Sequence, residues 1–182
     1  PVRDGEHRLG RAAARTGIVI VPCSPLLQAG GLESLLRDSD TVLLLAEAGF
    51  ADTIATVRAA LPAIADDRCV LVGTNAAPAG FVSFSDFIAG IDDGDPPDAG
   101  LGDDDVFNIM YSSGTTGAPK GIVHSHYVRS NYATMFASAF RMTPESVALH
   151  AGSMVFNGAM LSFLPWLYLG CSYIVHEAFD AA

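Results

Sequence analysis

Short runs of apolar residues, many of them β-branched, recur along this chain and are separated by segments with helical spacing. Three of these runs are Ile18–Val21, Thr41–Leu45 and Cys69–Val72. A run without alternating polar residues fits a strand that is buried on both faces, as in a parallel sheet covered by helices. Strands that alternate with helices predict an α/β fold with a largely parallel sheet.

The same alternation continues through the rest of the chain. We expect helices over residues 6–15, 32–37, 50–61, 86–91, 127–141 and 159–169. We expect further strands at residues 106–111, 121–124, 147–150 and 172–176. Gly17 can end the first helix, Ser85 is the expected N-cap of the fourth, and Pro165 should kink or interrupt the last.

An acidic segment separates two parts of the chain. Residues 92–105 (DDGDPPDAGLGDDD) contain two prolines and three glycines and offer almost no side chain that a core could bury. We therefore expect an exposed linker or mobile loop there. It would join a first α/β portion at residues 1–91 to a second portion at residues 106–182.

Composition narrows the class of protein. Of the 182 residues, 50% are hydrophobic and 16% are charged, which argues against intrinsic disorder. The formal net charge of -10 disfavours binding to nucleic acid or to anionic membrane surfaces. Three widely spaced cysteines match no metal-binding pattern and suggest reduced thiols in a cytoplasmic protein.

One long segment without charged side chains has the length of a membrane span. It runs from Ser146 to Val175 and contains no Asp, Glu, Lys or Arg. Polar and helix-breaking residues interrupt it, among them Asn157 and Pro165, and no Lys or Arg closely flanks it. We therefore interpret it as a buried helix followed by a buried strand, and expect no transmembrane span.

The run from Tyr111 to Gly121 (YSSGTTGAPKG) has the composition of a phosphate-binding loop. Four hydroxyl side chains occupy the five positions from Ser112 to Thr116, and three glycines let backbone N–H groups approach an anion. Lys120 adds a positive charge, and the loop follows an apolar strand, where ligands bind in open α/β sheets. A simple Ser/Thr/Gly turn is the alternative, but such turns rarely end in Pro-Lys-Gly.

The loop differs from a Walker-type P-loop. That pattern requires Gly-Lys-Ser/Thr at the start of a helix. Here Pro119 precedes Lys120 and Gly121 follows it. Because a proline disfavours helical conformation in the residue before it, we expect the loop to continue into an extended segment.

This run closely resembles the phosphate-binding signature of the adenylate-forming superfamily, which is Tyr-Thr-Ser-Gly-Thr-Thr-Gly-x-Pro-Lys-Gly. Ser112 replaces the usual first Thr and keeps its hydroxyl. The superfamily includes acyl- and aryl-CoA synthetases, the adenylation domains of peptide synthetases, and luciferases. Residues 17–25, 32–39 and 161–179 are also similar to the family pattern, so the resemblance covers nearly the whole chain. It implies the fold of part of the large N-terminal domain of such an enzyme.

The resemblance implies a two-step reaction. ATP and a small-molecule carboxylic acid form an acyl-adenylate and pyrophosphate with the help of Mg²⁺, and a thiol, often coenzyme A (CoA), then takes the acyl group. The residues implied in ATP binding are Ser112, Ser113, Gly114, Thr115, Thr116, Gly117 and Lys120. Among them, Thr116 and Lys120 are implied in catalysis, and Thr116 is also the implied metal contact.

A second site follows from a weaker match. The family commonly has a His after an aromatic residue in a Pro-Leu-Phe-His segment that lines the acyl pocket. Here Asn157 stands at the position of that His, and we take Phe156, Asn157, Gly158 and Ala159 as candidates for the acyl pocket. Asparagine can hydrogen-bond a carboxylate but cannot carry a proton. An N-cap role for Asn157 beside core aromatic residues is an equally compatible interpretation.

Two histidines near the signature raise the question of a metal site. His124 and His126 would share one face of an extended strand. Because no third ligand accompanies them, we interpret them as partly exposed strand histidines.

The function implied is that of a cytoplasmic AMP-forming acyl-CoA synthetase acting on a fatty or aryl acid. Segment 152–160 has no Asp to bind an α-amino group, which favours an acid with an uncharged tail. The alternatives are an amino-acid adenylation domain of a peptide synthetase and a non-catalytic, truncated nucleotide-binding module. The family's adenine, ribose and C-terminal lysine segments do not occur here. We therefore expect a fragment of a longer parent chain that is inactive alone.

Overall fold

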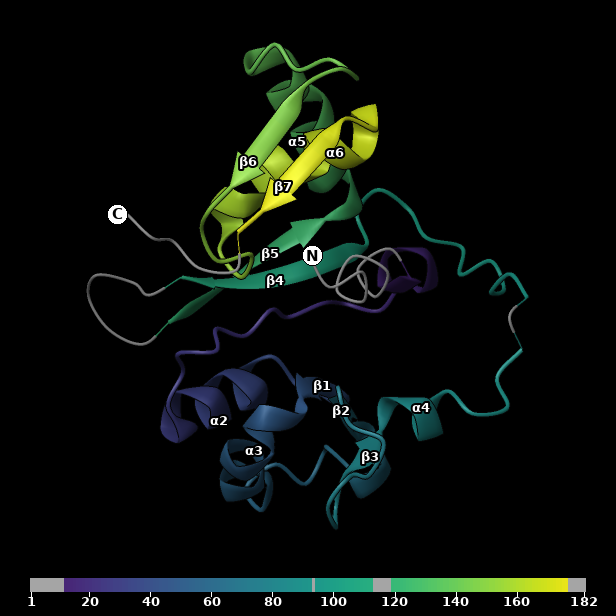
Figure 1. Cartoon of the computed structure of the whole chain (residues 1–182), viewed down its shortest axis with the longest axis vertical. Coiled ribbons are helices and arrows are strands. Elements are labelled where there is room, and N and C mark those ends of the chain that lie inside the picture. The colour runs from purple at the N-terminus through teal and green to yellow at the C-terminus, as the bar shows by residue number, and fades with distance from the viewer. Residues whose placement is uncertain (1–11, 93, 113–118, 177–182) are drawn as a thin grey trace. The chain divides into compact units, whose positions relative to one another are not determined.

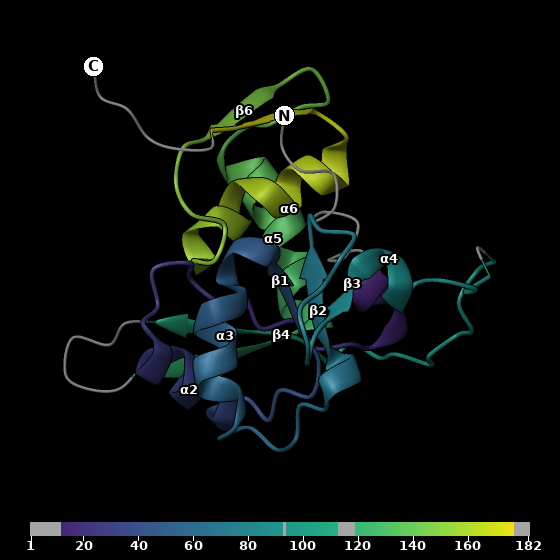
Figure 2. The same ribbon diagram turned by 60° about the horizontal axis from the view of Figure 1, so that its bottom comes forward.

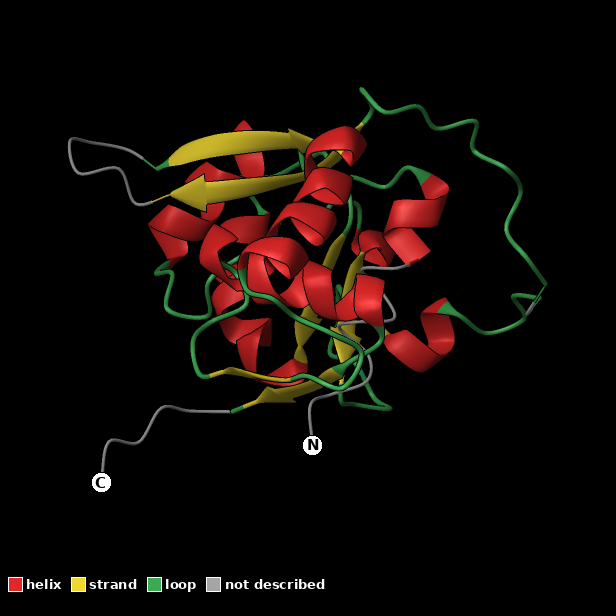
Figure 3. Cartoon of the chain, turned by 90° about the horizontal axis from the view of Figure 1, so that it is seen from above, coloured by secondary structure: helices red, strands yellow, loops and turns green. Residues whose placement is uncertain are grey.

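The computed structural model describes residues 12–92, 94–112 and 119–176. The chain forms two compact units, one of residues 25–95 and one of residues 1–24 together with residues 96–182. The described part of the acidic segment 92–105 has no helix or strand, and this long loop is drawn in green in Figure 3. The division into portions 1–91 and 106–182 stays a prediction.

The unit of residues 25–95 combines a small parallel sheet with short helices. Its helices are α2 (Ala29–Asp38), η1 (Ala48–Phe50), α3 (Ala51–Arg58), η2 (Asp66–Arg68) and α4 (Phe84–Phe87). Its strands are β1 (Leu44–Glu47), β2 (Cys69–Val72) and β3 (Val82–Ser83), which pair in parallel in the order β1-β2-β3.

Helices α2 and α3 pack side by side in this unit (Figure 2). Their apolar positions recur at helical spacing and supply the core together with the first residues of β2. The buried side chains are Leu32, Leu35, Leu36, Ile54, Val57, Cys69, Val70 and Leu71. The helix expected at residues 32–37 and the strand at residues 69–72 are thus confirmed.

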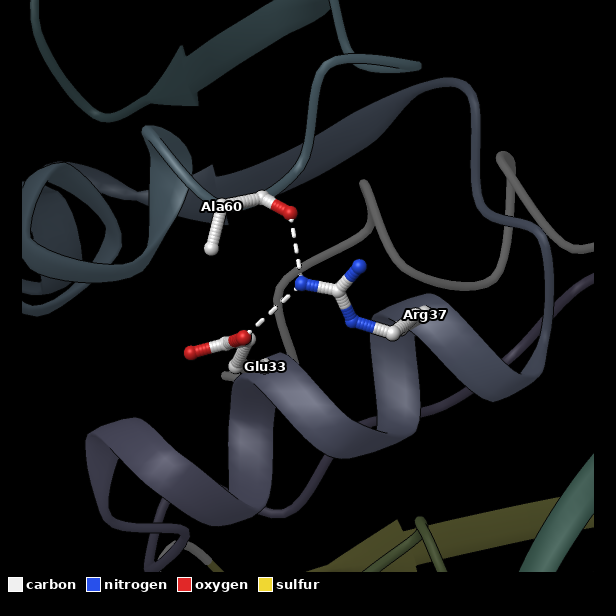
Figure 4. Close-up of polar contacts among 3 residues, drawn as sticks. All are labelled: Glu33, Arg37 and Ala60. Carbon is white, nitrogen blue, oxygen red and sulfur yellow. Dashed lines mark hydrogen bonds and ion pairs between the residues drawn. The ribbon is translucent and has the colours of Figure 1, made fainter.

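Arg37 links the end of α2 to the turn that follows α3. Its Nη2 donates to Glu33 Oε1 at 2.9 Å and to the Ala60 carbonyl at 2.7 Å (Figure 4). The Arg37 side chain is 60% exposed. Because solvent screens such a pair, it adds little to stability.

The unit of residues 1–24 and 96–182 carries the predicted site residues. Its strands are β4 (Val106–Ser112), β5 (Lys120–Ser125), β6 (Val147–His150) and β7 (Ser172–Val175). Its helices are α5 (His126–Ala139), η3 (Asn157–Ala159) and α6 (Met160–Leu169), with further helical residues at 12–16. Strands β4 and β5 pair antiparallel, whereas β6 and β7 pair in parallel. Helices α5 and α6 pack against each other, as Figure 1 shows.

The predicted alternation of helices and strands is confirmed, with parallel pairing in two of the three sheets that the structure describes. Gly17 follows the helical residues 12–16 with φ +74°, as its expected role as a helix terminator requires. Among the described residues, no helix has the length and apolar character needed to cross a bilayer.

Three elements differ from the prediction. The strand expected at residues 41–45 begins three residues later, as β1 (Leu44–Glu47). Among the described residues, the expected strand at residues 18–21 forms only one bridge, in which Ile20 pairs with Asn108 of β4, and Ile18 is 55% exposed. The fourth helix begins two residues earlier than expected. Its N-cap is Ser83, whose hydroxyl accepts the Asp86 N–H at 3.1 Å, whereas Ser85 lies inside the helix.

Candidate functional site

The predicted phosphate loop connects the two strands of an antiparallel hairpin. Strand β4 ends at Ser112 and β5 begins at Lys120, and these two residues face each other as the last pair of the ladder. Five of the predicted ATP-binding residues lie outside the described residues: Ser113, Gly114, Thr115, Thr116 and Gly117. The hairpin confirms that the segment after Pro119 is extended. Ser112, which carries a hydroxyl, and Lys120, which carries a positive charge, therefore face each other where the loop begins and ends.

Lys120 is the only lysine in the 182-residue sequence. It is exposed at the start of β5. A chain with a formal net charge of -10 therefore has its single ammonium group where the predicted loop ends. An exposed ammonium on a flexible stem can follow a phosphate group that moves during reaction.

Gly121 has a packing role that its place in the signature did not reveal. It pairs with Tyr111 across the hairpin. A Cβ at Gly121 would lie 3.0 Å from Ile109 Cγ2 and 3.0 Å from Tyr111 Cζ. The absence of a side chain at Gly121 thus lets the Tyr111 ring lie across β5 at the base of the loop.

A buried arginine on α5 connects β4 to η3. The Arg129 side chain is 2% exposed. Its Nε donates to Asn108 Oδ1 at 2.9 Å, its Nη1 donates to Asn157 Oδ1 at 2.8 Å, and its Nη2 contacts Met110 Sδ at 3.1 Å. Burial lowers the pKa of Arg129 to about 10, so the guanidinium stays charged at neutral pH.

His124 is buried beside this arginine, which corrects the expectation of a partly exposed histidine. Its side chain is 6% exposed, and its ring meets Tyr132 edge-on with centroids 6.2 Å apart. Its Nδ1 has no hydrogen-bond partner among the described residues. Burial and the charge of Arg129 lower the pKa of His124, so the neutral ring is favoured. The described residues contain no group of three or more His, Cys, Asp or Glu that could hold a metal ion.

Asn157 is the first residue of η3 and is not a helix N-cap. The residue before η3 is Phe156, and no side chain caps this turn. The Asn157 side chain instead accepts from Arg129 and extends its Nδ2 to within 3.4 Å of the Tyr132 hydroxyl. This corrects the N-cap interpretation.

The four candidates for the acyl pocket differ in exposure. Phe156 is 51% exposed, and Asn157 is half-buried. A Cβ at Gly158 would meet no described atom within 4 Å, so open space lies beside it. Ala159 is 2% exposed and packs inside the unit.

Sequence reasoning missed Asn108 and Arg129. Asn108 is 3% exposed in the middle of β4, an otherwise apolar strand. A lone amide within an apolar strand is the signal that could have indicated a buried polar partner, because a buried amide must be hydrogen-bonded. Arg129 gives no comparable signal, since arginine is common on exposed helix faces.

The sequence model of the family described as AMP-binding enzyme matches residues 11–182. This match covers almost the whole chain, including the hairpin that carries the signature. The chain therefore belongs to the AMP-binding enzyme family, as the resemblance of residues 111–121 to the adenylate-forming signature indicated.

The chain is similar to individual curated enzymes, among them a CoA synthase and a carrier-protein ligase. It is 32% identical over 171 residues to a feruloyl-CoA synthase of Amycolatopsis sp, covering 93% of this chain and 31% of that protein. It is 36% identical over 118 residues to an L-proline–[L-prolyl-carrier protein] ligase of Pseudomonas fluorescens, covering 64% of this chain and 21% of that protein. The chain thus spans about a third or less of the length of these curated relatives.

A solved structure supports the fold. The anthranilate CoA ligase AuaEII, crystallised with anthranoyl-AMP, superposes with a TM-score of 0.76 at 27% identity. The match covers 87% of this chain and 30% of that one. The α/β fold with parallel strands is therefore that of adenylate-forming enzymes, as expected.

Proposed function

We propose that this chain is part of a longer AMP-forming ligase that activates a fatty or aryl carboxylic acid with ATP and then transfers the acyl group to CoA. The observation that carries the proposal is the signature at residues 111–121, placed at the end of the β4–β5 hairpin in a member of the AMP-binding enzyme family. The relatives that activate ferulate and anthranilate support an aryl acid. The cytoplasm, where ATP and CoA are available, is the proposed location.

The proposed ATP site follows the loop. Residues 112–117 would surround the β- and γ-phosphates with hydroxyl and backbone N–H groups, with Thr115 and Thr116 as the main hydroxyl donors. Lys120 would stabilise the negative charge that develops on the departing pyrophosphate. Mg²⁺ would bind with the ATP phosphates and the Thr116 hydroxyl, because this ion is usually held by substrate phosphates and few protein ligands.

The proposed acid site is formed by residues 156–159. Asn157 would donate a hydrogen bond to the acid, and Phe156 would offer an apolar ring for an aryl or alkyl tail. These residues belong to the same unit as the β4–β5 hairpin. The acid and the ATP phosphates would therefore bind to one structural unit.

A second candidate function is activation of an amino acid for a carrier protein. The identity of 36% to the L-proline ligase supports it. Acid-dependent ATP–pyrophosphate exchange by the longer protein separates the two candidates. We expect exchange with aryl or fatty acids. Exchange only with amino acids would favour the second candidate, and ATP binding without exchange would indicate a non-catalytic nucleotide-binding module.

The loop assignment predicts the effect of removing its main polar groups. In the longer protein, Lys120→Ala combined with Thr116→Ala should slow acid-dependent exchange by about 100-fold or more, since preorganised donors to a developing negative charge contribute that much. Folding, measured by circular dichroism and thermal unfolding, should be preserved because Lys120 is exposed.

Thr134→Ala provides the control, because Thr134 is exposed on α5 and its hydroxyl donates to the Asn131 carbonyl of the same helix. That variant should exchange at the wild-type rate. Unchanged exchange in the double variant would refute the assignment of the loop.

A further inference from the structure

Arg129 is a buried charge whose partners are neutral. It is 2% exposed, and among the residues that the structure describes no carboxylate forms an ion pair with it. Its contacts are two side-chain amides, a thioether sulfur and the face of the Tyr132 ring, whose centroid lies 5.1 Å from Arg129 Cζ. Burying a charge without an opposite charge costs stability, and a well-packed apolar side chain could fill the same space at lower cost. The arrangement therefore indicates a role other than stabilising the fold.

The guanidinium determines how the Asn157 amide is oriented. An arginine side chain has five N–H donors and no acceptor. The Asn157 atom 2.8 Å from Nη1 must therefore be its oxygen, and the Nδ2 group must face away from Arg129. One N–H of Nδ2 points toward the Tyr132 hydroxyl over a long 3.4 Å. Its second N–H has no partner among the described residues.

The residues on both sides of Asn157 are exposed. Phe156 before it is 51% exposed, and a Cβ on Gly158 after it would meet no described atom within 4 Å. Asn157 itself is half-buried between them, so a small molecule could reach its side chain from this surface. The positive charge on the oxygen side also polarises the amide, which strengthens its N–H groups as donors.

We propose that Arg129 is a positioning residue for the acid substrate. It holds the Asn157 carboxamide with its oxygen inward, so that the Nδ2 donor is presented to an oxygen of the bound carboxylic acid. Because Arg129 also bonds Asn108 in β4, it fixes this donor relative to the strand that ends at Ser112. The inference rests on the proposed function, which places the acid at residues 156–159.

The decisive variant is Asn157→Asp in the longer ligase. An aspartate has almost the same shape and can still accept from Arg129, so the folded state should be as stable as the wild type or more so. The outward N–H donor, however, is replaced by a carboxylate oxygen that repels the acid. We expect the KM for the acid to rise by about 10- to 100-fold, with the KM for ATP within about twofold of wild type.

Arg129→Lys tests the positioning step itself. A lysine keeps the positive charge but cannot form the fork that fixes both amides. We expect the KM for the acid to rise by about tenfold, again without a matching change for ATP. The matched controls are Arg37→Lys, at an exposed arginine with two similar hydrogen bonds, and Asn131→Asp on α5. Both controls should leave the KM for the acid and the KM for ATP unchanged.

The outcomes distinguish this inference from the proposed function. A wild-type enzyme that exchanges normally, together with an Asn157→Asp variant whose acid KM is unchanged, would overturn the inference alone. Equal increases in the acid and ATP constants of Arg129→Lys, with a lowered unfolding temperature, would indicate a purely structural role and overturn it as well. A folded wild-type protein without exchange for any acid would refute the proposed function and the inference together.

Discussion

His124 illustrates how burial changes the chemistry of one residue. Its pKa in the folded state lies below its ordinary value because burial and the nearby Arg129 charge disfavour the protonated ring. As the pH falls, the unfolded state therefore binds a proton before the folded state does. Above a pH of about 6.5 both states are neutral at this position, and His124 makes no pH-dependent contribution. Below that pH, protonation of the unfolded state destabilises the fold progressively.

The direction of the His124 pKa shift predicts how the stability of the fold depends on pH. Between about pH 7 and pH 5, the free energy of unfolding of the 182-residue chain should fall more steeply for the wild type than for His124→Gln, which cannot titrate. Denaturant unfolding at several pH values measures this free energy. Parallel profiles for the two proteins would contradict the prediction. His126→Gln is the control, because it shows whether a shallower pH dependence follows from the removal of any histidine.

At the scale of elements, strand pairing decides where helix α4 begins. Ser83 and Ser85 are both reasonable N-caps by residue type. Ser83 is the last residue of β3, and its pairing with Leu71 of β2 holds its backbone extended, with φ -69° and ψ 150°. An extended residue that precedes the first helical turn is the N-cap by definition. The buried Ser83 hydroxyl accordingly accepts the Asp86 N–H.

This cap can be tested by paired substitutions. Ser83→Ala should lower the free energy of unfolding by about 0.5–2 kcal/mol, because the Asp86 N–H loses its acceptor. Ser85→Ala should cost less, because Ser85 is exposed and caps no backbone group. Denaturant titration of both variants provides the comparison. A larger loss for Ser85→Ala would favour the cap that the sequence predicted.

The expected strand at residues 18–21 shows a limit of apolar patterns at the same scale. Four consecutive apolar residues indicate a buried strand, but Ile18 and Val19 are 55% and 39% exposed. In the described part of the chain only Ile20 pairs, donating to Phe107 O at 3.3 Å and accepting from Ile109 N at 3.0 Å. Burial of both faces requires neighbouring strands and covering helices, which a local pattern cannot guarantee.

At the scale of the whole molecule, the chain contains the signature loop but spans 31% of the feruloyl-CoA synthase that it resembles. The adenine, ribose and C-terminal lysine segments implied by the family do not occur in its sequence. We therefore predict that the isolated 182-residue chain shows no acid-dependent ATP–pyrophosphate exchange, whereas the longer ligase does. Both proteins should be assayed with the same acids at equal concentration. Exchange by the isolated chain would show that the loop and acid site suffice.

The sequence alone determined the α/β alternation, the hydroxyl- and glycine-rich loop and the membership of an adenylate-forming family. Each of these depends on residues that are close together in the chain, where spacing and backbone preference act directly. The tertiary structure alone revealed the contacts of Arg129 with Asn108 and Asn157, which lie 21 and 28 residues away. Such contacts form only when β4, α5 and η3 pack together. Burial makes an unpaired polar group costly, so the packing of these elements decides which side chains far apart in the sequence form hydrogen bonds.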